Sequence, residues 1–164
     1  MNVVGYEYYE PYYHTFLQTD YPRNGMNYLF DQTQHGRYVV RESSAEDSDL
    51  EADYMAVHFT LATDKIMGGN VYIDGELTHH IYDDNSMMQY NNETQQYEKT
   101  LLLKQGSYNY MYTFVPDGAR QATLSRTEGN YYETINEYVV KVYHRPPGAR
   151  YDRLIGTTVC YSGK

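Results

Sequence analysis

The chain's only cysteine, Cys160, is the first candidate for nucleophilic chemistry. It lies between Val159 and Tyr161 in a strand-like segment, whereas a catalytic thiol needs an accessible and electropositive setting. A single cysteine also excludes an internal disulfide and every cysteine-based zinc pattern. The sequence contains neither a G-x-S-x-G nucleophile motif nor a glycine-rich phosphate loop. We therefore expect no catalytic residues and a protein that is not an enzyme.

Histidines and carboxylates provide the candidate metal ligands. His79 and His80 form the only adjacent histidine pair, and Asp83 and Asp84 follow closely. Adjacent residues of a strand point to opposite faces, so the two imidazole rings are badly placed to share one ion. The acidic stretch 42–53 misses the EF-hand spacing and is typical of a solvated connection. We expect no metal ion and no cofactor.

A compact charged group, Arg150-Tyr151-Asp152-Arg153, follows the stiff turn at residues 146–148. Two guanidinium groups flank one carboxylate here, and two interpretations are open. The group is either a structural corner that fixes the last strand or a docking surface, because Arg and Tyr are frequent at binding hot spots.

The charge balance narrows the range of partners. The 164 residues include 22 acidic and 13 basic side chains, which give a formal net charge of −9. Nucleic acid and anionic membrane surfaces both require clustered Lys and Arg, so neither is an expected partner. No run of about 18 apolar residues is present, so no membrane span is expected. Residues 1–14 lack the basic and apolar regions of a signal peptide.

The elements that must position these residues are predicted to be strands. The chain has 22 tyrosines, and tyrosine favours pleated, half-buried surfaces. Short segments with period-2 alternation recur between turn signals such as Lys104-Gln105-Gly106 and Pro116-Asp117-Gly118. Their number and spacing predict an all-β fold, a two-sheet antiparallel sandwich. The main strand candidates are residues 36–41, 54–63, 70–75, 96–104, 107–115, 138–144 and 153–161. Alternation places four residues on one face of 54–63, four on one face of 107–115, and three pointing inward in 138–144. These are Met55, Val57, Phe59 and Leu61; Tyr108, Tyr110, Tyr112 and Phe114; and Tyr138, Val140 and Val142.

Residues 1–25 differ from the rest of the chain. They are rich in tyrosine, no period is sustained, and Pro11 and Pro22 interrupt any strand ladder. We expect this stretch to be an extended arm or interdomain linker, and residues 26–164 to form the sandwich domain.

A set of strand and turn residues in the middle of the chain forms a recognisable pattern. These residues are Val71–Gly75, Met88–Tyr90, Tyr97, Leu101–Leu103, Gly106 and Tyr108–Tyr110. The pattern resembles the early-set immunoglobulin-like modules, which include the glycogen-binding modules of glucan-branching enzymes. The resemblance implies an immunoglobulin-like sandwich and, as an alternative function, a carbohydrate-binding module. His80 stands where the pattern of the modules has a sugar-stacking tryptophan, and Tyr72 and Tyr90 are the other candidate sugar contacts.

A second pattern spans most of residues 19–156. Its segments are Thr19–Gly25, Gly36–Tyr38, Glu51–Leu61, Leu103–Tyr110, Glu128–Tyr138 and Arg150–Gly156. Together they resemble the C-terminal part of the type IX secretion system plug protein family. The resemblance implies a periplasmic, outer-membrane-associated accessory protein without enzymatic activity, which occludes the outer-membrane translocon. It also implies two partners, the translocon and an upstream β-rich domain of the same protein.

Overall fold

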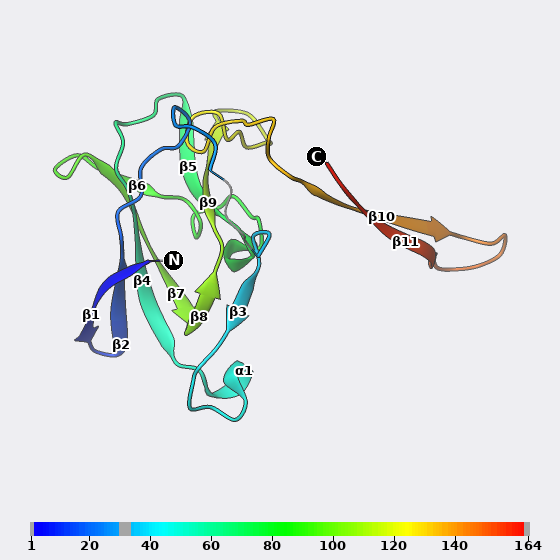
Figure 1. Cartoon of the computed structure of the whole chain (residues 1–164), viewed down its shortest axis with the longest axis horizontal. Coiled ribbons are helices and arrows are strands. Elements are labelled where there is room, and N and C mark those ends of the chain that lie inside the picture. Colours follow the sequence, from blue (N-terminus) through cyan, green and yellow to red (C-terminus); the bar gives the residue numbers. More distant parts are fainter. Residues whose placement is uncertain (1, 30–33, 163–164) are drawn as a thin grey trace. The chain divides into compact units, whose positions relative to one another are not determined.

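The structure, a computed structural model, describes residues 2–29 and 34–162. The chain divides into two compact units, each described separately below (Figure 1). The first unit comprises residues 1–27 and 31–130, and the second comprises 28–30 and 131–164. Nearly all regular structure in the described residues is strand; the exceptions are the short helix α1 (Ser48–Glu51) and the 3-10 turn η1 (Glu76–Thr78). The predicted all-β class is confirmed.

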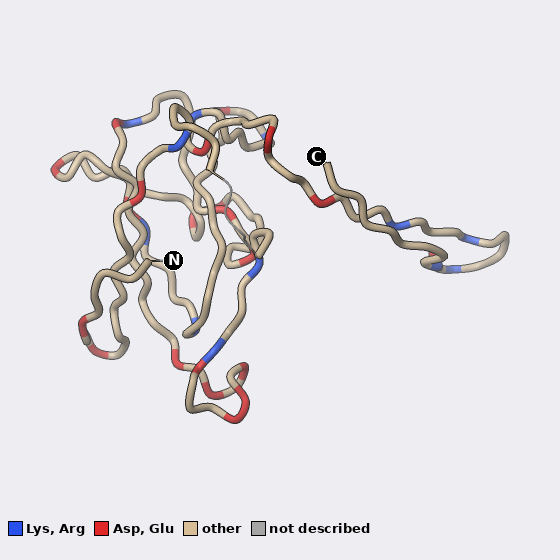
Figure 2. The backbone as a smooth tube through the Cα atoms, viewed as in Figure 1, with Lys and Arg blue, Asp and Glu red and all other residues tan. Residues whose placement is uncertain are grey.

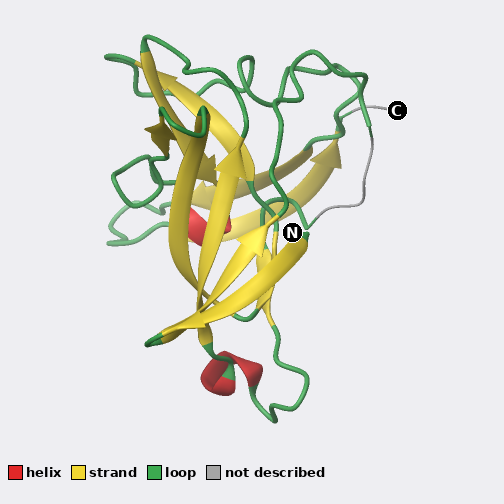
Figure 3. Ribbon diagram, turned by 90° about the vertical axis from the view of Figure 1, so that its left-hand side faces the viewer, coloured by secondary structure: helices red, strands yellow, loops and turns green. Residues whose placement is uncertain are grey.

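The largest sheet of the first unit has five strands, in the order β1-β2-β4-β7-β6. Figure 3 shows the strands of the chain in yellow. All neighbours pair antiparallel except β2 and β4, which run parallel with Phe16 opposite His58. The strands are β1 (Val3–Tyr9), β2 (Tyr12–Leu17), β4 (Tyr54–Leu61), β7 (Gln96–Lys104) and β6 (Gln89–Asn91).

Strands β1 and β2 lie within residues 1–25, which we expected to be an extended arm. Pro11 falls in the turn between the two strands, and Pro22 follows the bridge of Asp20 to Leu61, so neither proline interrupts a ladder. Tyrosines occupy adjacent positions, such as Tyr12 and Tyr13, and therefore both faces of these strands. Such doubling hides the alternation by which a strand is recognised in a sequence.

Two smaller strand pairs complete the first unit. Strand β3 (Tyr38–Val40) pairs with β8 (Gly106–Tyr108), and β5 (Gly69–Asp74) pairs with β9 (Met111–Pro116). A Cβ atom at Gly106 would lie 2.3 Å from the Val39 carbonyl oxygen, so the close approach of β3 and β8 depends on glycine there.

The core joins the five-stranded sheet to the β5–β9 pair. The alternating residues predicted for one face of β4 pack there, and Phe59 and Leu61 are each only 1% exposed. Val71 and Ile73 of β5 are completely buried. Burying one such side chain contributes about 1.5–3 kcal/mol, so this cluster is the main stabilising feature of the unit. Its buried members are Leu17, Val57, Phe59, Leu61, Val71, Ile73, Met88, Tyr97, Leu103, Tyr108, Tyr112 and Phe114.

The second unit contains a β-hairpin of β10 (Glu137–His144) and β11 (Arg153–Tyr161), which pair antiparallel. We expected Tyr138, Val140 and Val142 to point inward, but they are 53%, 47% and 48% exposed. Alternation predicts which side chains share a face, and it carries no information about what covers that face. Contacts also separate this hairpin from the domain of residues 26–164 to which the sequence assigned it.

Among residues 2–29 and 34–162, no helix combines the length and the apolar character needed to cross a membrane.

Candidate functional site

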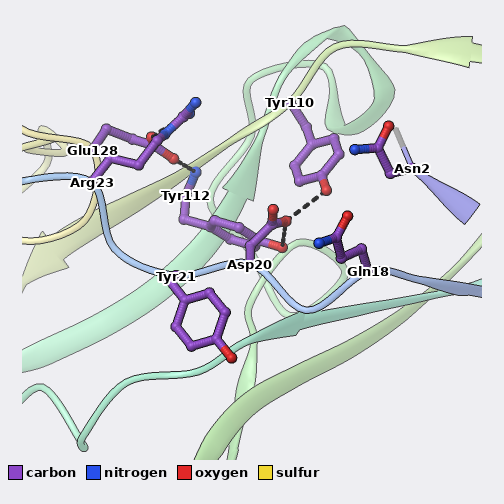
Figure 4. Close-up of a pocket in the computed structure, with 8 residues that line it drawn as sticks. All are labelled: Asn2, Gln18, Asp20, Tyr21, Arg23, Tyr110, Tyr112 and Glu128. Atoms are coloured by element: carbon purple, nitrogen blue, oxygen red, sulfur yellow. Dashed lines mark hydrogen bonds and ion pairs between the residues drawn. The ribbon is translucent and has the colours of Figure 1, made fainter. Parts of the chain in front are cut away.

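The first unit contains a polar pocket of about 310 Å³ (Figure 4). Its walls come from the segment that follows β2, from the start of β9, and from Asn2 and Glu128 near the two ends of the first unit. The lining residues are Asn2, Gln18, Asp20, Tyr21, Arg23, Tyr110, Tyr112 and Glu128.

Asp20 lies at the centre of the pocket, and its backbone is fixed beside the end of β4. Its N–H donates to the Thr60 carbonyl at 2.9 Å, and its own carbonyl accepts from the Ala62 N–H at 2.8 Å. The side-chain Oδ2 accepts from the hydroxyls of Tyr110 at 2.7 Å and Tyr112 at 2.8 Å. The other oxygen, Oδ1, has no hydrogen-bond partner among the described residues. The pocket thus contains a carboxylate that is held rigidly and has one oxygen available.

The two tyrosines are held by the core. Tyr112 is 3% exposed, and the Tyr110 ring packs edge-on against Phe59 with 5.0 Å between ring centroids. Burial raises the pKa of both hydroxyls, and the nearby Asp20 carboxylate raises them further. Both hydroxyls therefore remain protonated at neutral pH and act as donors to Asp20.

An ion pair forms another part of the wall. Glu128 Oε1 accepts from the Tyr112 backbone N–H at 2.9 Å, and its Oε2 accepts from Arg23 Nε at 2.6 Å. The Arg23 side chain is 63% exposed, whereas that of Glu128 is 12% exposed. The Arg23 charge is therefore balanced locally, and the formal charge of the pocket rests on Asp20.

The predicted Arg150–Arg153 group lies at the tip of the hairpin. We expected Arg150 and Arg153 to flank Asp152, but the ion pair is a different one. Asp152 accepts from Nε and Nη2 of Arg145, each at 2.9 Å, rather than from the neighbouring Arg150 or Arg153. This two-bond geometry is favourable for an Arg–carboxylate pair. Both side chains are about half exposed, and Tyr151 is 70% exposed.

The three predicted sugar contacts do not form one exposed surface. Tyr72 is 9% exposed and packs edge-on against Tyr82. His80 Nδ1 lies 2.8 Å from Asp74 Oδ1, and the Tyr82 hydroxyl donates to the other oxygen of Asp74 at 2.8 Å. Burial, followed by this hydrogen bond, raises the pKa of Tyr82 to about 12. His80 is thus part of a local hydrogen-bonded cluster around the buried Asp74 carboxylate.

Tyr90, the third of these residues, lies on β6 at the edge of the five-stranded sheet. Its ring is partly buried and packs edge-on against Tyr97, with 5.0 Å between centroids. Lys65 Nζ lies 5.9 Å from the ring centroid, which is within cation–π range. The ring is therefore engaged by neighbours on more than one side.

No pattern in the sequence connects the residues of the Asp20 pocket. Asp20 is separated from Tyr110 by 90 positions, and the alternation of β9 predicted only that Tyr110 and Tyr112 share a face. Asp20 lies in the segment Thr19–Gly25, which carries part of the family resemblance, but nothing in that segment indicates a binding site. Within the described part of the chain, no group of three His, Cys, Asp or Glu side chains is arranged to hold a metal ion.

Comparisons with known proteins identify a relative of known structure. No protein-family model matches the chain, and no curated protein matches it. A hypothetical protein from Parabacteroides merdae ATCC 43184, with a crystal structure at 2.30 Å resolution, is 52% identical. The match has a TM-score of 0.90 and covers 99% of this chain and 41% of that protein. The chain therefore shares its fold with a protein of which it spans about two fifths.

Proposed function

We propose that the chain is a binding protein without enzymatic activity, the C-terminal part of a plug-like accessory protein of the type IX secretion translocon. The observation that carries this proposal is the apolar hairpin β10–β11.

The hairpin exposes large apolar side chains on both of its faces. A two-stranded hairpin alone is marginally stable in water, and contiguous exposed apolar surface marks an interaction site. Another protein surface that covers these side chains would stabilise the hairpin. The large apolar residues in question, each between 46% and 65% exposed, are Tyr138, Val139, Val140, Val142, Tyr143, Leu154, Ile155, Val159 and Tyr161.

Charge supports a protein partner as well. Residues 131–164 carry five basic and three acidic side chains, whereas residues 1–130 carry eight basic and 19 acidic side chains. Figure 2 shows acidic residues gathered in the loop around α1 of the first unit and several basic residues along the hairpin. A basic tip that contains Tyr151 has the residue types common at binding hot spots. This favours the docking interpretation of the Arg150–Arg153 group.

The proposal also covers fold and location. The core shared by the five-stranded sheet and the β5–β9 pair supports an immunoglobulin-like sandwich of two sheets for the first unit. The solved relative extends well beyond the matched segment, which supports a further domain as one partner. The periplasmic location and the translocon as the other partner rest on the family resemblance of the sequence.

The carbohydrate-binding alternative receives less support. Sugar stacking needs an exposed aromatic plane, and Tyr72 is buried while His80 is bonded to Asp74. We retain it as the second function to be tested.

Co-purification tests the proposed function. The translocon is isolated from native membranes of a bacterium that encodes this protein, and the bound protein is quantified by immunoblot. We expect the wild type to be recovered, and the Val140→Ser/Tyr143→Ser variant to be recovered at least about tenfold less, because it loses apolar contact area. Tyr132→Ser is the matched control, since Tyr132 is 93% exposed and lies outside both strands. Absence of the wild-type protein from the isolated translocon would overturn the assignment.

A further inference from the structure

We propose that the Asp20 pocket binds a primary ammonium group, carried either by a small amine or by a lysine side chain. The inference concerns the first unit only and does not depend on the hairpin or on the translocon.

The pocket offers several acceptors to a ligand. The free oxygen of Asp20 is an acceptor, and the hydroxyl oxygens of Tyr110 and Tyr112 keep lone pairs after donating their protons to Asp20. The side chains of Asn2 and Gln18 add a carbonyl acceptor each, together with amide donors. An ammonium group carries three donors and no acceptor, so the oxygens of Asp20 and of the two tyrosines can accept its hydrogen bonds.

Charge favours a cation over an anion. Asp20 contributes a negative charge that no cation in the pocket balances, because the Arg23 guanidinium is paired with Glu128. The surrounding residues 1–130 carry 19 acidic and eight basic side chains, which raises the local concentration of cations. The hydrogen bonds from the two tyrosines hold the Asp20 carboxylate in place before a ligand arrives, so binding costs little reorganisation.

Size and shape are consistent with a small or tethered ligand. A volume of about 310 Å³ lies at the lower end for small-molecule sites, which range from about 300 to 1,000 Å³. Three tyrosines line the pocket; the hydroxyls of Tyr110 and Tyr112 point at Asp20, and Tyr21 is 63% exposed (Figure 4). The two hydroxyls can accept from the cationic end of an amine, and the apolar ring of Tyr21 can contact its aliphatic stem.

Isothermal titration of the 164-residue protein tests the inference with three probes. 1,5-Diaminopentane represents a free amine, Nα-acetyl-lysine amide represents a lysine side chain, and 1,5-pentanediol is the neutral control. We expect at least one of the two amines to bind, and the diol to bind at least about tenfold more weakly because it lacks the charge. Binding of the lysine amide alone would assign the site to a protein partner. Binding of the diamine alone would assign it to a free amine.

Variants locate the binding site. We expect Asp20→Asn and Tyr21→Ala each to weaken amine binding by about tenfold, while Tyr8→Ala, on an exposed position of β1, leaves it unchanged. Because Asp20 also bonds two tyrosines, the Tyr21 variant tests the site with the hydrogen bonds of Asp20 intact. The inference is overturned if neither amine binds, if the diol binds as tightly as the amines, or if all variants bind like the wild type.

Discussion

Replacing Tyr112 with Phe removes a single hydroxyl group from the centre of the first unit. The ring is 3% exposed, and its hydroxyl donates to Asp20 at 2.8 Å. The backbone bonds of Tyr112 to Thr127 and Glu128 do not involve the hydroxyl, so the variant keeps them. The Tyr110 hydroxyl still bonds the same Asp20 oxygen, so the carboxylate keeps one donor.

The loss of stability follows from the charged acceptor. A hydrogen bond to a charged group contributes about 1.5–3 kcal/mol, and the remaining Tyr110 bond favours the lower part of that range. We therefore expect Tyr112→Phe to lower the free energy of unfolding by about 2 kcal/mol at pH 7.

The same variant changes the dependence of stability on alkaline pH. Burial raises the pKa of Tyr112 above its ordinary value of 10.0, so near that pH the unfolded chain releases a proton that the folded chain retains. The resulting contribution to stability is complete below pH 10 and decreases as the pH rises above it. Above pH 10, each such tyrosine lowers the free energy of unfolding by about 1.4 kcal/mol per pH unit. Tyr112→Phe should therefore make this alkaline decline less steep by about that amount.

Urea denaturation at pH 7 and at several values above pH 10 measures both effects. Tyr8→Phe is the control, because Tyr8 is 57% exposed on β1. A loss below about 0.5 kcal/mol at pH 7, together with an unchanged alkaline slope, would refute the role assigned to this hydroxyl.

Three further outcomes are expected. Phe59→Ala should lower the free energy of unfolding by about 3–5 kcal/mol in urea denaturation, because Phe59 is 1% exposed in the core; a loss under about 1 kcal/mol would contradict this packing. Burial, followed by the charge of His14 at 2.8 Å, lowers the pKa of His58, so stability should fall as the pH drops below about 6.5. In thermal melts at several pH values, His58→Gln should make that decline less steep, and an unaltered pH profile of the melting temperature would refute the role given to His58. Affinity electrophoresis on soluble glycogen should show no retardation, and retardation abolished by Tyr72→Ala or Tyr90→Ala would instead support the carbohydrate-binding alternative.

Several features followed from local sequence patterns alone. Alternating apolar residues predicted the core face of β4, with Met55, Val57, Phe59 and Leu61 on one side, and the structure confirms it. The same reasoning predicted that Tyr108, Tyr110, Tyr112 and Phe114 share one face, and all four pack in or against the core. Local patterns succeed here because a half-buried strand requires a period of two, whatever its partner is.

Other features were decided only by the tertiary structure. Tyrosines at adjacent positions masked β1 and β2, and only pairing with β4 shows that residues 3–17 belong to the sheet. The hairpin has the alternation of a buried strand, yet Tyr138 and Val140 are about half exposed. Alternation depends on the chain's own geometry, whereas burial depends on which surface packs against it.

The Asp20 pocket is the clearest case. Its polar residues lie at opposite ends of the first unit's sequence, from Asn2 to Glu128, and no spacing rule connects them. Composition by itself determined an acidic, tyrosine-rich protein, and local alternation with turn signals determined its all-β class. The contact of Asp20 with Tyr110 and Tyr112 requires both the pairing of β2 with β4 and the packing of β9 against the core. A site built from side chains distant in sequence depends on that packing, which no local pattern encodes.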